Sequence, residues 1–405
     1  MQKILIYTKK ITPRIQYVFD FVLHEFSDLD VELTTDRSFF EASGLPKINY
    51  SGERFTDEIH LASDEFMFET GISDKVKFKE LSSVGKLFFA LSRYEEYQPH
   101  EKDHHNRFPG KGKVYKTPFI DEWILQFQKE LKQKHPQLEF KKRDFELILT
   151  CDVDQAWKYK HKGFKRTLGA YWRDLIKLDF NEFSKRRRII SEDEADPFDT
   201  FDYFKLLKEK YDFKMIFFWL MADYGHFDKN NPVGNSNFQN KIREASTWAG
   251  CGIHPSYVSN SSKEKLKAEI ERLSGILEEP IEKSRQHYIR LSFPGTYQNL
   301  INAGIKEDFT MGYPDETGFR AGTCTPFFWY DLQNETRAEL KIHPFCAMDA
   351  TLQSYLKLNT EDAKAELLRL KSQIQKVNGE MMILFHNSNL NEQWRGWDEV
   401  LESLF

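Results

Sequence analysis

From residue 145 to the C-terminus, short apolar runs alternate with amphipathic helical segments, and this alternation constrains the fold more than any other feature. Strands that alternate with helices favour a parallel sheet, which is either open or closed into a barrel. In such folds the chemistry lies at the carboxyl ends of the strands. The runs that we expect to form strands span residues 145–151, 215–220, 250–253, 288–293 and 381–385.

Three segments between these runs have the spacing of amphipathic helices, namely 200–211, 261–278 and 361–377. The clearest is 261–278, where Ser261 and Glu264 fit a capping box that would begin the helix. Apolar residues three or four positions apart form one stripe that can pack against a sheet. In 261–278 this stripe consists of Leu266, Ile270, Leu273 and Leu277.

Residues 1–138 predict a separate, smaller α/β domain of unknown role. A strand at 4–7, a helical pattern at 15–26 and a β-rich run near residue 31 indicate alternating elements. A polar, Lys-rich helix at 126–137 contains a proline that would end it. A chain of 405 residues is long for one domain, so we place a boundary near residue 138 and assign 139–405 to the second domain.

The composition excludes several classes of protein. The net charge is −5, so no global positive field exists to attract nucleic acid. No run approaches about 20 consecutive apolar residues, so we expect no membrane span. No export signal is visible, and the four cysteines form no Cys-x-x-Cys pair. We therefore expect a soluble, cytoplasmic protein with reduced and buried thiols, and the sequence leaves its oligomeric state open.

Residues 158–190 interrupt the alternation with a segment rich in Lys and Arg, which acidic residues follow at 192–194. One interpretation is a solvated insertion whose charges partly cancel. The other is a lid that grips an anionic substrate. Because this insertion is charged and has few apolar anchors, a protease should cut first within 158–197.

Polar residues follow three of the expected strands. Asp152 and Asp154 lie where the run 145–151 ends, His254 follows 250–253, and His386 follows 381–385. Two carboxylates at one strand end can serve as a metal ligand and a proton acceptor, or simply cap the next helix. A lone histidine is more often structural than catalytic, but three polar groups at three strand ends favour one shared site.

With these motifs, the chain from about 145 to 390 resembles the NodB-type polysaccharide deacetylases of carbohydrate esterase family 4, in a divergent branch. The resemblance implies a distorted (β/α) barrel in which Asp152 is the catalytic base and Asp154 a metal ligand. It implies that His254 is a second ligand, and that His386, in a Leu-x-His motif, is the general acid. The segment LSRYEEY at 91–97 resembles part of an N-terminal domain that precedes such barrels in some bacterial proteins.

The chain departs from the family pattern at the second histidine of the metal motif, because that position is Val258. Another residue must then complete the metal site. His287 is the first choice, although it would lie at the start of the expected strand 288–293 and hence at the wrong end of a regular barrel. His343 is the second choice, and for both a structural role stays open.

Substrate contacts are predicted for Arg290, Arg320 and Tyr313. Either arginine could orient Asp152 or contact the substrate, or could be a salt-bridge partner only. The segments 308–313 and 318–324 resemble substrate-side segments of deacetylase-like proteins. Aromatic residues could stack on sugar rings or belong to the core, and the candidates are Trp219, Tyr297, Tyr313 and Trp329.

The predicted function is that of a metal-dependent hydrolase that removes acetyl groups from an amino sugar or glycan, with zinc as the expected divalent metal. Two alternatives stay open. One is an inactive pseudo-enzyme that binds a glycan, and the other is a hydrolase of a different amide or ester. The sequence does not distinguish N- from O-deacetylation.

Overall fold

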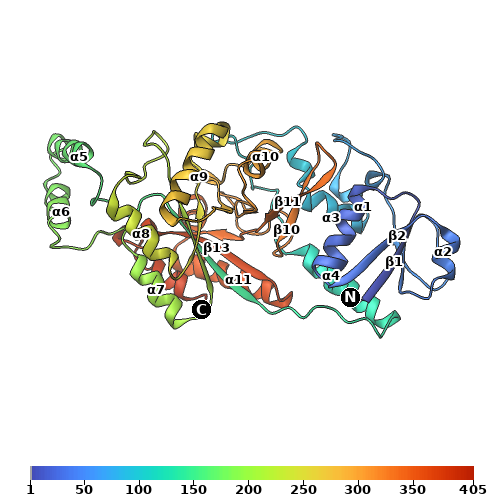
Figure 1. The fold of residues 1–405 in the computed structure, drawn as a ribbon. Coiled ribbons are helices and arrows are strands. Elements are labelled where there is room, and N and C mark those ends of the chain that lie inside the picture. The colour runs from blue at the N-terminus through green and yellow to red at the C-terminus, as the bar shows by residue number, and fades with distance from the viewer. Residues whose placement is uncertain (1) are drawn as a thin grey trace.

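The computed structural model describes residues 2–405, which form two sheets with helices around them (Figure 1). A four-stranded sheet uses residues before 63, and a nine-stranded sheet uses residues after 145. The predicted α/β class with parallel sheets is confirmed. The molecule is elongated, with the four-stranded sheet toward one end (Figure 1).

The N-terminal sheet is parallel, with the strand order β2-β1-β3-β4. Its strands are β1 (Gln2–Thr8), β2 (Leu29–Thr34), β3 (Lys47–Ser51) and β4 (Ile59–Ala62). Helix α1 (Pro13–Phe19) begins with proline, and Thr12 caps it by accepting a hydrogen bond from the Ile15 amide. The helix continues as a π-helical segment at Asp20–Glu25.

Three further helices complete this part of the chain: α2 (Arg37–Ala42), α3 (Ser83–Leu91) and α4 (Phe119–Lys134). The helix expected at 126–137 therefore begins about two turns earlier than predicted, and it ends before Pro136. The residue before a proline is disfavoured in a helix, which explains this end.

The second sheet has the order β10-β11-β9-β8-β7-β6-β5-β13-β12, and only the pair β10–β11 is antiparallel. Among residues 2–405 no strand pairing joins β12 to β10, so a closed barrel is not shown. The strands are β5 (Glu146–Val153), β6 (Lys214–Trp219), β7 (Gly250–Ile253), β8 (Lys283–Ser284), β9 (Glu307–Asp308), β10 (Phe327–Asp331), β11 (Thr336–Ile342), β12 (Ala347–Met348) and β13 (Glu380–His386).

The helices that accompany this sheet are α7 (Phe201–Lys210), α8 (Ser236–Ser246), α9 (Lys263–Leu277), α10 (Gly295–Asn302), α11 (Thr360–Lys376) and α12 (Trp397–Glu402). Helix α9 begins one residue later than a capping box at Ser261 would place it. Ser262 is the cap, and its hydroxyl accepts a hydrogen bond from the Lys265 amide.

The prediction of a strand at 288–293 is wrong. The strand in this region is the two-residue β8, and a short 3₁₀ turn at His287–Ile289 follows it. An apolar run of this length is ambiguous from its pattern alone. The error matters because His287 now follows the carboxyl end of a strand, where it can join a site.

The basic insertion forms two helices, α5 (Phe164–Ile176) and α6 (Phe180–Ile190). They pack on each other as a hairpin that projects from one end of the molecule (Figure 1). No helix within residues 2–405 combines the length and the apolar character that crossing a bilayer requires.

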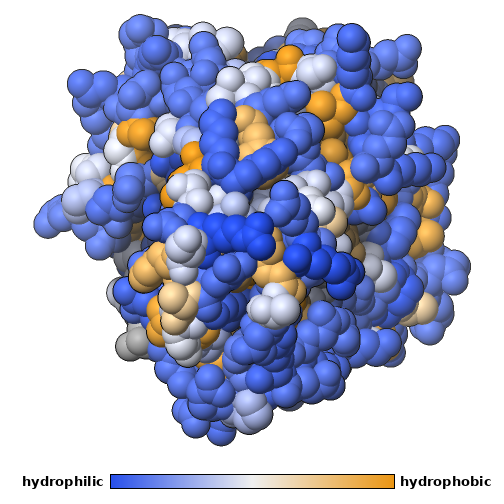
Figure 2. Space-filling model, turned by 90° about the vertical axis from the view of Figure 1, so that its right-hand side faces the viewer, coloured by the Kyte–Doolittle hydropathy of each residue, from blue (hydrophilic) through white to orange (hydrophobic). Residues whose placement is uncertain are grey.

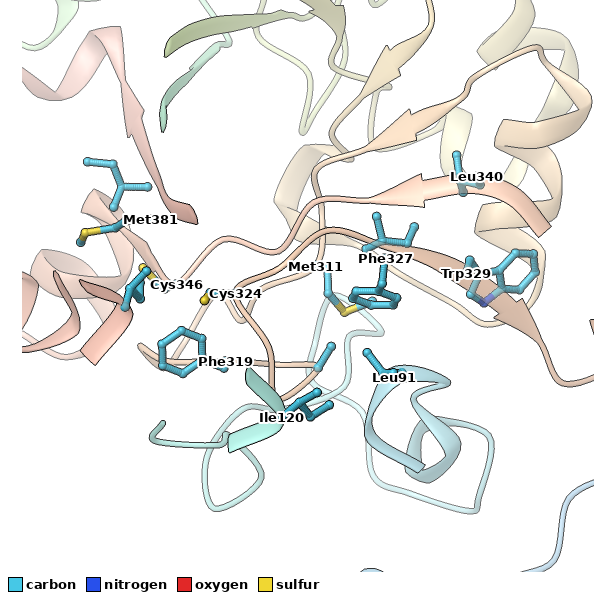
Figure 3. Close-up of a cluster of buried hydrophobic side chains, with 14 of the residues drawn as sticks. Leu91, Ile120, Met311, Phe319, Cys324, Phe327, Trp329, Leu340, Cys346 and Met381 are labelled. Carbon is cyan, nitrogen blue, oxygen red and sulfur yellow. The ribbon is translucent and has the colours of Figure 1, made fainter. Parts of the chain in front are cut away.

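Buried hydrophobic residues run without a break from one sheet region to the other. Figure 3 shows this junction, where Leu91 and Ile120 face Met311, Phe319 and Phe327. The end of the molecule that carries α2 is mostly hydrophilic, with scattered apolar patches (Figure 2). The cysteines are free, as predicted, and three of the four are buried.

A buried ion-pair network crosses the same junction. Arg320 binds Glu96 through two hydrogen bonds, of 2.9 and 2.6 Å. Arg93 donates to Glu96 and to the carbonyl oxygen of Arg320. The segments 91–97 and 318–324, which the sequence singles out separately, therefore meet in one structure.

Candidate active site

A cavity of about 280 Å³ lies at the carboxyl ends of the central strands. Strand register brings its residues together, since Asp152 on β5 pairs with His386 on β13, and Ile253 on β7 pairs with Ser284 on β8. The residues lining the cavity are Arg107, Asp152, Asp154, Gln155, Phe227, Lys229, His254, His287, Tyr288, Ile289, Met348, Ala350, Tyr355 and His386.

Asp152 is buried, and Arg285 orients it. The Nη1 of Arg285 lies 3.2 Å from Oδ1 of Asp152 and donates to the Thr150 hydroxyl at 2.6 Å. The Nε of Arg285 donates to the carbonyl oxygen of Phe309 at 2.9 Å. These contacts fix the guanidinium, so one carboxylate oxygen of Asp152 is held in place while Oδ2 lies 3.6 Å from Nε2 of His254.

Asp154, His254 and His287 form a compact cluster. The Nε2 atoms of both histidines lie 3.4 Å from Oδ1 of Asp154, and the potential ligand atoms all lie within 4.8 Å of one another. Ligands about 2.1 Å from a shared tetrahedral centre are separated by about 3.4 Å. The two nitrogen–oxygen separations therefore match those of ligands around one ion such as zinc.

Hydrogen bonds at the far nitrogens orient both imidazoles. Nδ1 of His254 lies 2.6 Å from the carbonyl oxygen of Arg285, and Nδ1 of His287 lies 2.8 Å from Oδ1 of Asp228. Asp228 also accepts a hydrogen bond from the Tyr257 amide. A carbonyl requires a protonated Nδ1, which leaves the Nε2 lone pair of His254 facing Asp154.

Gly252 allows β7 to bring His254 to this position. A Cβ at Gly252 would lie 2.9 Å from the carbonyl oxygen of Lys283 and 2.6 Å from the Phe218 ring. Any larger residue would push β7 away from β8. The glycine therefore sets the spacing between the strand ends that carry His254 and His287.

The electrostatics of the cluster favour a cation. Burial raises the pKa of Asp154, but the charge of His287 and contacts with both imidazoles hold that pKa well below its usual range. Burial lowers the pKa of His287, whereas Asp154 and Asp228 raise it, to about 9. Oδ1 of Asp154 is buried and has no hydrogen-bond partner within residues 2–405, so a bound cation would satisfy it.

His386 stands on the other side of the cavity, paired with Asp349. Its Nδ1 lies 2.8 Å from Oδ1 of the fully buried Asp349, which also accepts from the His386 amide. Burial lowers the pKa of His386, but the charge and hydrogen bond of Asp349 raise it, to about 10. The imidazole is therefore protonated at neutral pH and can donate a proton into the cavity.

The wall formed by Tyr288 and Ile289 has strained backbone. Both residues have positive φ, of 61° and 56°, which is rare for a β-branched residue such as Ile289. Arg107 holds this wall, since its Nη1 donates to the Tyr288 carbonyl at 2.8 Å and its Nη2 to the Tyr355 hydroxyl at 3.1 Å. Strain of this kind is found most often at functional sites.

The three residues predicted to contact substrate do not line the cavity. Arg320 belongs to the buried pair with Glu96, and Tyr313 accepts a hydrogen bond from Arg93. Arg290 donates to the carbonyls of His105 and Tyr257, and so braces two loops.

His343, the second choice as a ligand, lies 2.8 Å from Glu307 and stacks on Phe309, outside the cavity lining. The aromatic candidates for sugar stacking are buried and are also absent from the cavity lining, and these are Trp219, Tyr297, Tyr313 and Trp329.

Sequence reasoning missed four residues that shape the site: Arg107, Asp228, Arg285 and Asp349. Arg285 lies two positions before His287, so its presence in the same polar run was a usable signal. Asp228 lies in a loop 59 residues from His287, and Asp349 directly follows β12, 37 residues from His386. No local pattern marks either of them.

Comparison with known protein families matches only the first part of the chain, and comparison with solved structures finds distant similarities. Residues 4–136 match a family of unknown function, DUF7033. The comparison with curated proteins finds no match. Among solved structures, the chain is 11% identical to a polysaccharide deacetylase candidate from Mycobacterium smegmatis, with a TM-score of 0.40 over 65% of this chain and 85% of that one.

Two further structures are similar at the same level of identity. One is a polysaccharide deacetylase from Bacillus cereus, with 12% identity and a TM-score of 0.32 over 65% of this chain and 85% of that chain. The other is a mutant of a CE4 family pseudoenzyme with restored enzymatic activity, with 12% identity and a TM-score of 0.30 over 68% of this chain and 76% of that chain.

Proposed function

We propose that the chain is a metal-dependent hydrolase of the carbohydrate-deacetylase type, built on a distorted barrel-like sheet. One observation carries this proposal. Asp154, His254 and His287 form a ligand-spaced cluster in the same cavity as a buried, arginine-held Asp152 and a protonated His386. A base, an acid and a cation site around one cavity suit the hydrolysis of an amide or ester.

The donor set suits a divalent ion, with zinc as the first choice, because one carboxylate and two imidazoles are typical ligands of zinc. The ion would be held by Asp154, His254 and His287, with Asp228 and the Arg285 carbonyl orienting the imidazoles. A divalent ion at this point would polarise a water molecule and the acyl carbonyl of a substrate.

The proton transfers are assigned to two residues. Asp152, whose Oδ1 is held by Arg285, accepts a proton from the attacking water through Oδ2. His386, charged through its contact with Asp349, donates a proton to the departing amine or alcohol. The two residues are register partners on neighbouring strands, so they flank the same substrate group.

The substrate proposed is an acetylated amino sugar or glycan. Polar groups from several elements project into the cavity, together with the aromatic rings of Phe227, Tyr288 and Tyr355. Such a mixture suits a sugar, whose hydroxyls need hydrogen bonds and whose apolar face stacks on rings.

We keep residue 138 as the proposed boundary between the two parts, although Arg107, from the first part, lines the cavity.

Metal analysis combined with an acetate-release assay tests the proposal. Purified protein should hold about one zinc per chain, and chelation should abolish acetate release from acetylated amino-sugar oligomers until zinc is restored. Folded protein without affinity for zinc would contradict the metal site. Zinc-loaded protein that binds oligomers but releases no acetate would instead favour a glycan-binding pseudo-enzyme.

A further inference from the structure

The hairpin of α5 and α6 carries its apolar residues on the outside. On α5, Phe164, Leu168 and Trp172 follow one another at four-residue spacing, and Phe164 is 81% and Trp172 66% exposed. The buried residue of α5 is instead Asp174, which pairs with Arg186 of α6 at 2.7 Å. A helix that packs on a protein core turns its apolar stripe inward, so this hairpin has the reverse arrangement.

The apolar surface continues from α5 across the turn into α6. The large apolar residues exposed along the hairpin are Phe164, Leu168, Trp172, Leu175, Ile176, Leu178, Phe180 and Ile190. A soluble protein rarely leaves so many large apolar side chains together in water, and such a patch marks an interaction surface. The hairpin projects at the end of the molecule opposite to α2 (Figure 1), and these apolar side chains are exposed in the part of the chain that the structure describes.

The charge of the hairpin indicates what covers this surface. Residues 164–190 contain eight Lys or Arg against three Asp or Glu, although the whole chain has a net charge of −5. Lys165, Arg173 and Lys177 are exposed on α5 beside the apolar residues. Basic residues next to exposed Trp, Phe and Leu are typical of helices that lie in the headgroup region of an anionic bilayer.

A second copy of the chain is a poorer occupant. Two hairpins packed face to face would bring like charges together, and like-charge contacts oppose association. An anionic lipid surface accepts the apolar side chains and neutralises the basic ones in one contact. The charge complementarity therefore favours a membrane surface over self-association.

The positive charge extends from the hairpin to the active site. A hollow of about 490 Å³ is lined by Lys158, Lys162, Arg166, Arg173, Arg186 and Lys229, and it shares Gln155 and Lys229 with the catalytic cavity. Lys162 binds Gln155, and Arg166 donates to the Asn230 carbonyl. Burial lowers the pKa of Lys162 to about 7, so at neutral pH the positive charge of the hollow comes chiefly from its other basic residues.

We propose that the α5–α6 hairpin docks the protein on an anionic lipid surface, with its apolar side chains in the interface and its basic side chains on the phosphate headgroups. Docking in this way would bring the basic hollow and the catalytic cavity next to the bilayer. A glycan carried on a lipid would then be within reach, a consequence that rests on the proposed deacetylase activity.

Sedimentation with lipid vesicles tests the docking without any catalytic assay. The full chain should pellet with vesicles of phosphatidylcholine and phosphatidylglycerol in equal parts, and much less with phosphatidylcholine alone or at high salt. The double variant Leu168→Ser/Trp172→Ser should lower the affinity by roughly tenfold or more, since both side chains enter the apolar phase. The matched control is Leu206→Ser on α7, an equally exposed leucine that should leave binding unchanged.

Bromine-labelled lipids locate the contact. They should quench part of the tryptophan fluorescence of the wild type, and Trp172→Phe should keep vesicle binding while losing that quenching. Wild-type protein that stays in the supernatant with anionic vesicles overturns the proposal. A concentration-dependent dimer in analytical ultracentrifugation that the double variant abolishes, without vesicle binding, overturns it in favour of self-association. Neither result bears on zinc binding or acetate release, so the two proposals fail separately.

Discussion

At the scale of single residues, two acids two positions apart have different partners. Asp152 is held by Arg285, whereas Asp154 faces the two histidines. Asp152→Asn should retain zinc and lose roughly 10²- to 10⁴-fold in rate, because only the base is removed. Asp154→Asn should lose zinc, because an amide is a poor ligand. Metal content and acetate release measured together check both, and an unchanged rate in Asp152→Asn would rule out the assigned base.

The pair of His386 and Asp349 makes the activity depend on pH. The ordinary pKa of a histidine is about 6.5. Asp349 raises the pKa of His386 to about 10, so His386 stays protonated until the pH passes that value. The upper limb of the pH–rate profile should therefore fall near pH 10. In Asp349→Asn the raising charge is gone, so this limb should move down toward neutral pH. The profile of kcat/KM in both proteins measures the shift.

The same pair contributes to stability with a known sign. The pKa of His386 is higher in the folded protein than in the unfolded chain, so protonation of His386 stabilises the fold. This stabilisation is complete below the unfolded pKa of about 6.5 and is lost as the pH rises through about 10. Asp349→Asn should therefore be less stable than wild type near pH 6 and closer to it above pH 10. A pH-independent stability difference would contradict the assigned contact.

At the scale of elements, the segment around Arg107 links the first part of the chain to the cavity wall. Arg107 also binds Asp103 and is almost fully buried, so it positions Tyr288 and Tyr355 rather than moving freely. Arg107→Ala should lower acetate release by roughly tenfold to a hundredfold, since the loss of a positioning contact misplaces the wall. Lys111→Ala, an exposed change nearby, should have no effect.

The separate effects of Arg107→Ala on KM, kcat and zinc content test the positioning role. A positioning role predicts that KM and kcat both change while zinc content stays at the wild-type level. Rescue of part of the loss by Arg107→Lys would show that charge matters, whereas no rescue would show that the forked hydrogen bonds matter. Loss of zinc in Arg107→Ala would contradict a role confined to the wall.

The α5–α6 hairpin should also be the first element that a protease cuts. It projects from the body (Figure 1), and its turn at 177–179 is exposed, with Leu178 in a left-handed conformation. Brief trypsin treatment should cleave after Lys177 or within 185–188, while the two sheets stay intact. Mass spectrometry of the fragments gives the positions, and first cuts within 2–62 would contradict this order.

At the scale of the whole molecule, buried ion pairs join the two parts. Glu96 faces both Arg93 and Arg320, and all three are buried. Glu96→Ala would leave two arginines without their carboxylate, which should cost about 3–5 kcal/mol in the free energy of unfolding. Urea denaturation measures the loss. The exposed pair of Lys9 and Glu65 supplies the control, because Glu65→Gln should change stability little.

Local features of this protein can be predicted from its amino-acid sequence. The α/β class, four of the nine strands of the central sheet (β5, β6, β7 and β13) and the polar residues that follow them can be predicted, because an apolar run and the residue after it are neighbours in the chain. Asp152, Asp154, His254 and His386 follow such runs, and parallel strands bring their ends to one edge.

The distant residues that position these side chains depend on how the whole chain folds. Arg285 rather than Arg290 or Arg320 holds Asp152, and Asp228 and Asp349 orient histidines far along the chain. His287 joins the cluster because β8 is only two residues long, a length set by pairing with β7 and β9. The outward apolar face of α5 is likewise a tertiary fact, because helical periodicity shows a stripe but not the side on which the rest of the protein lies.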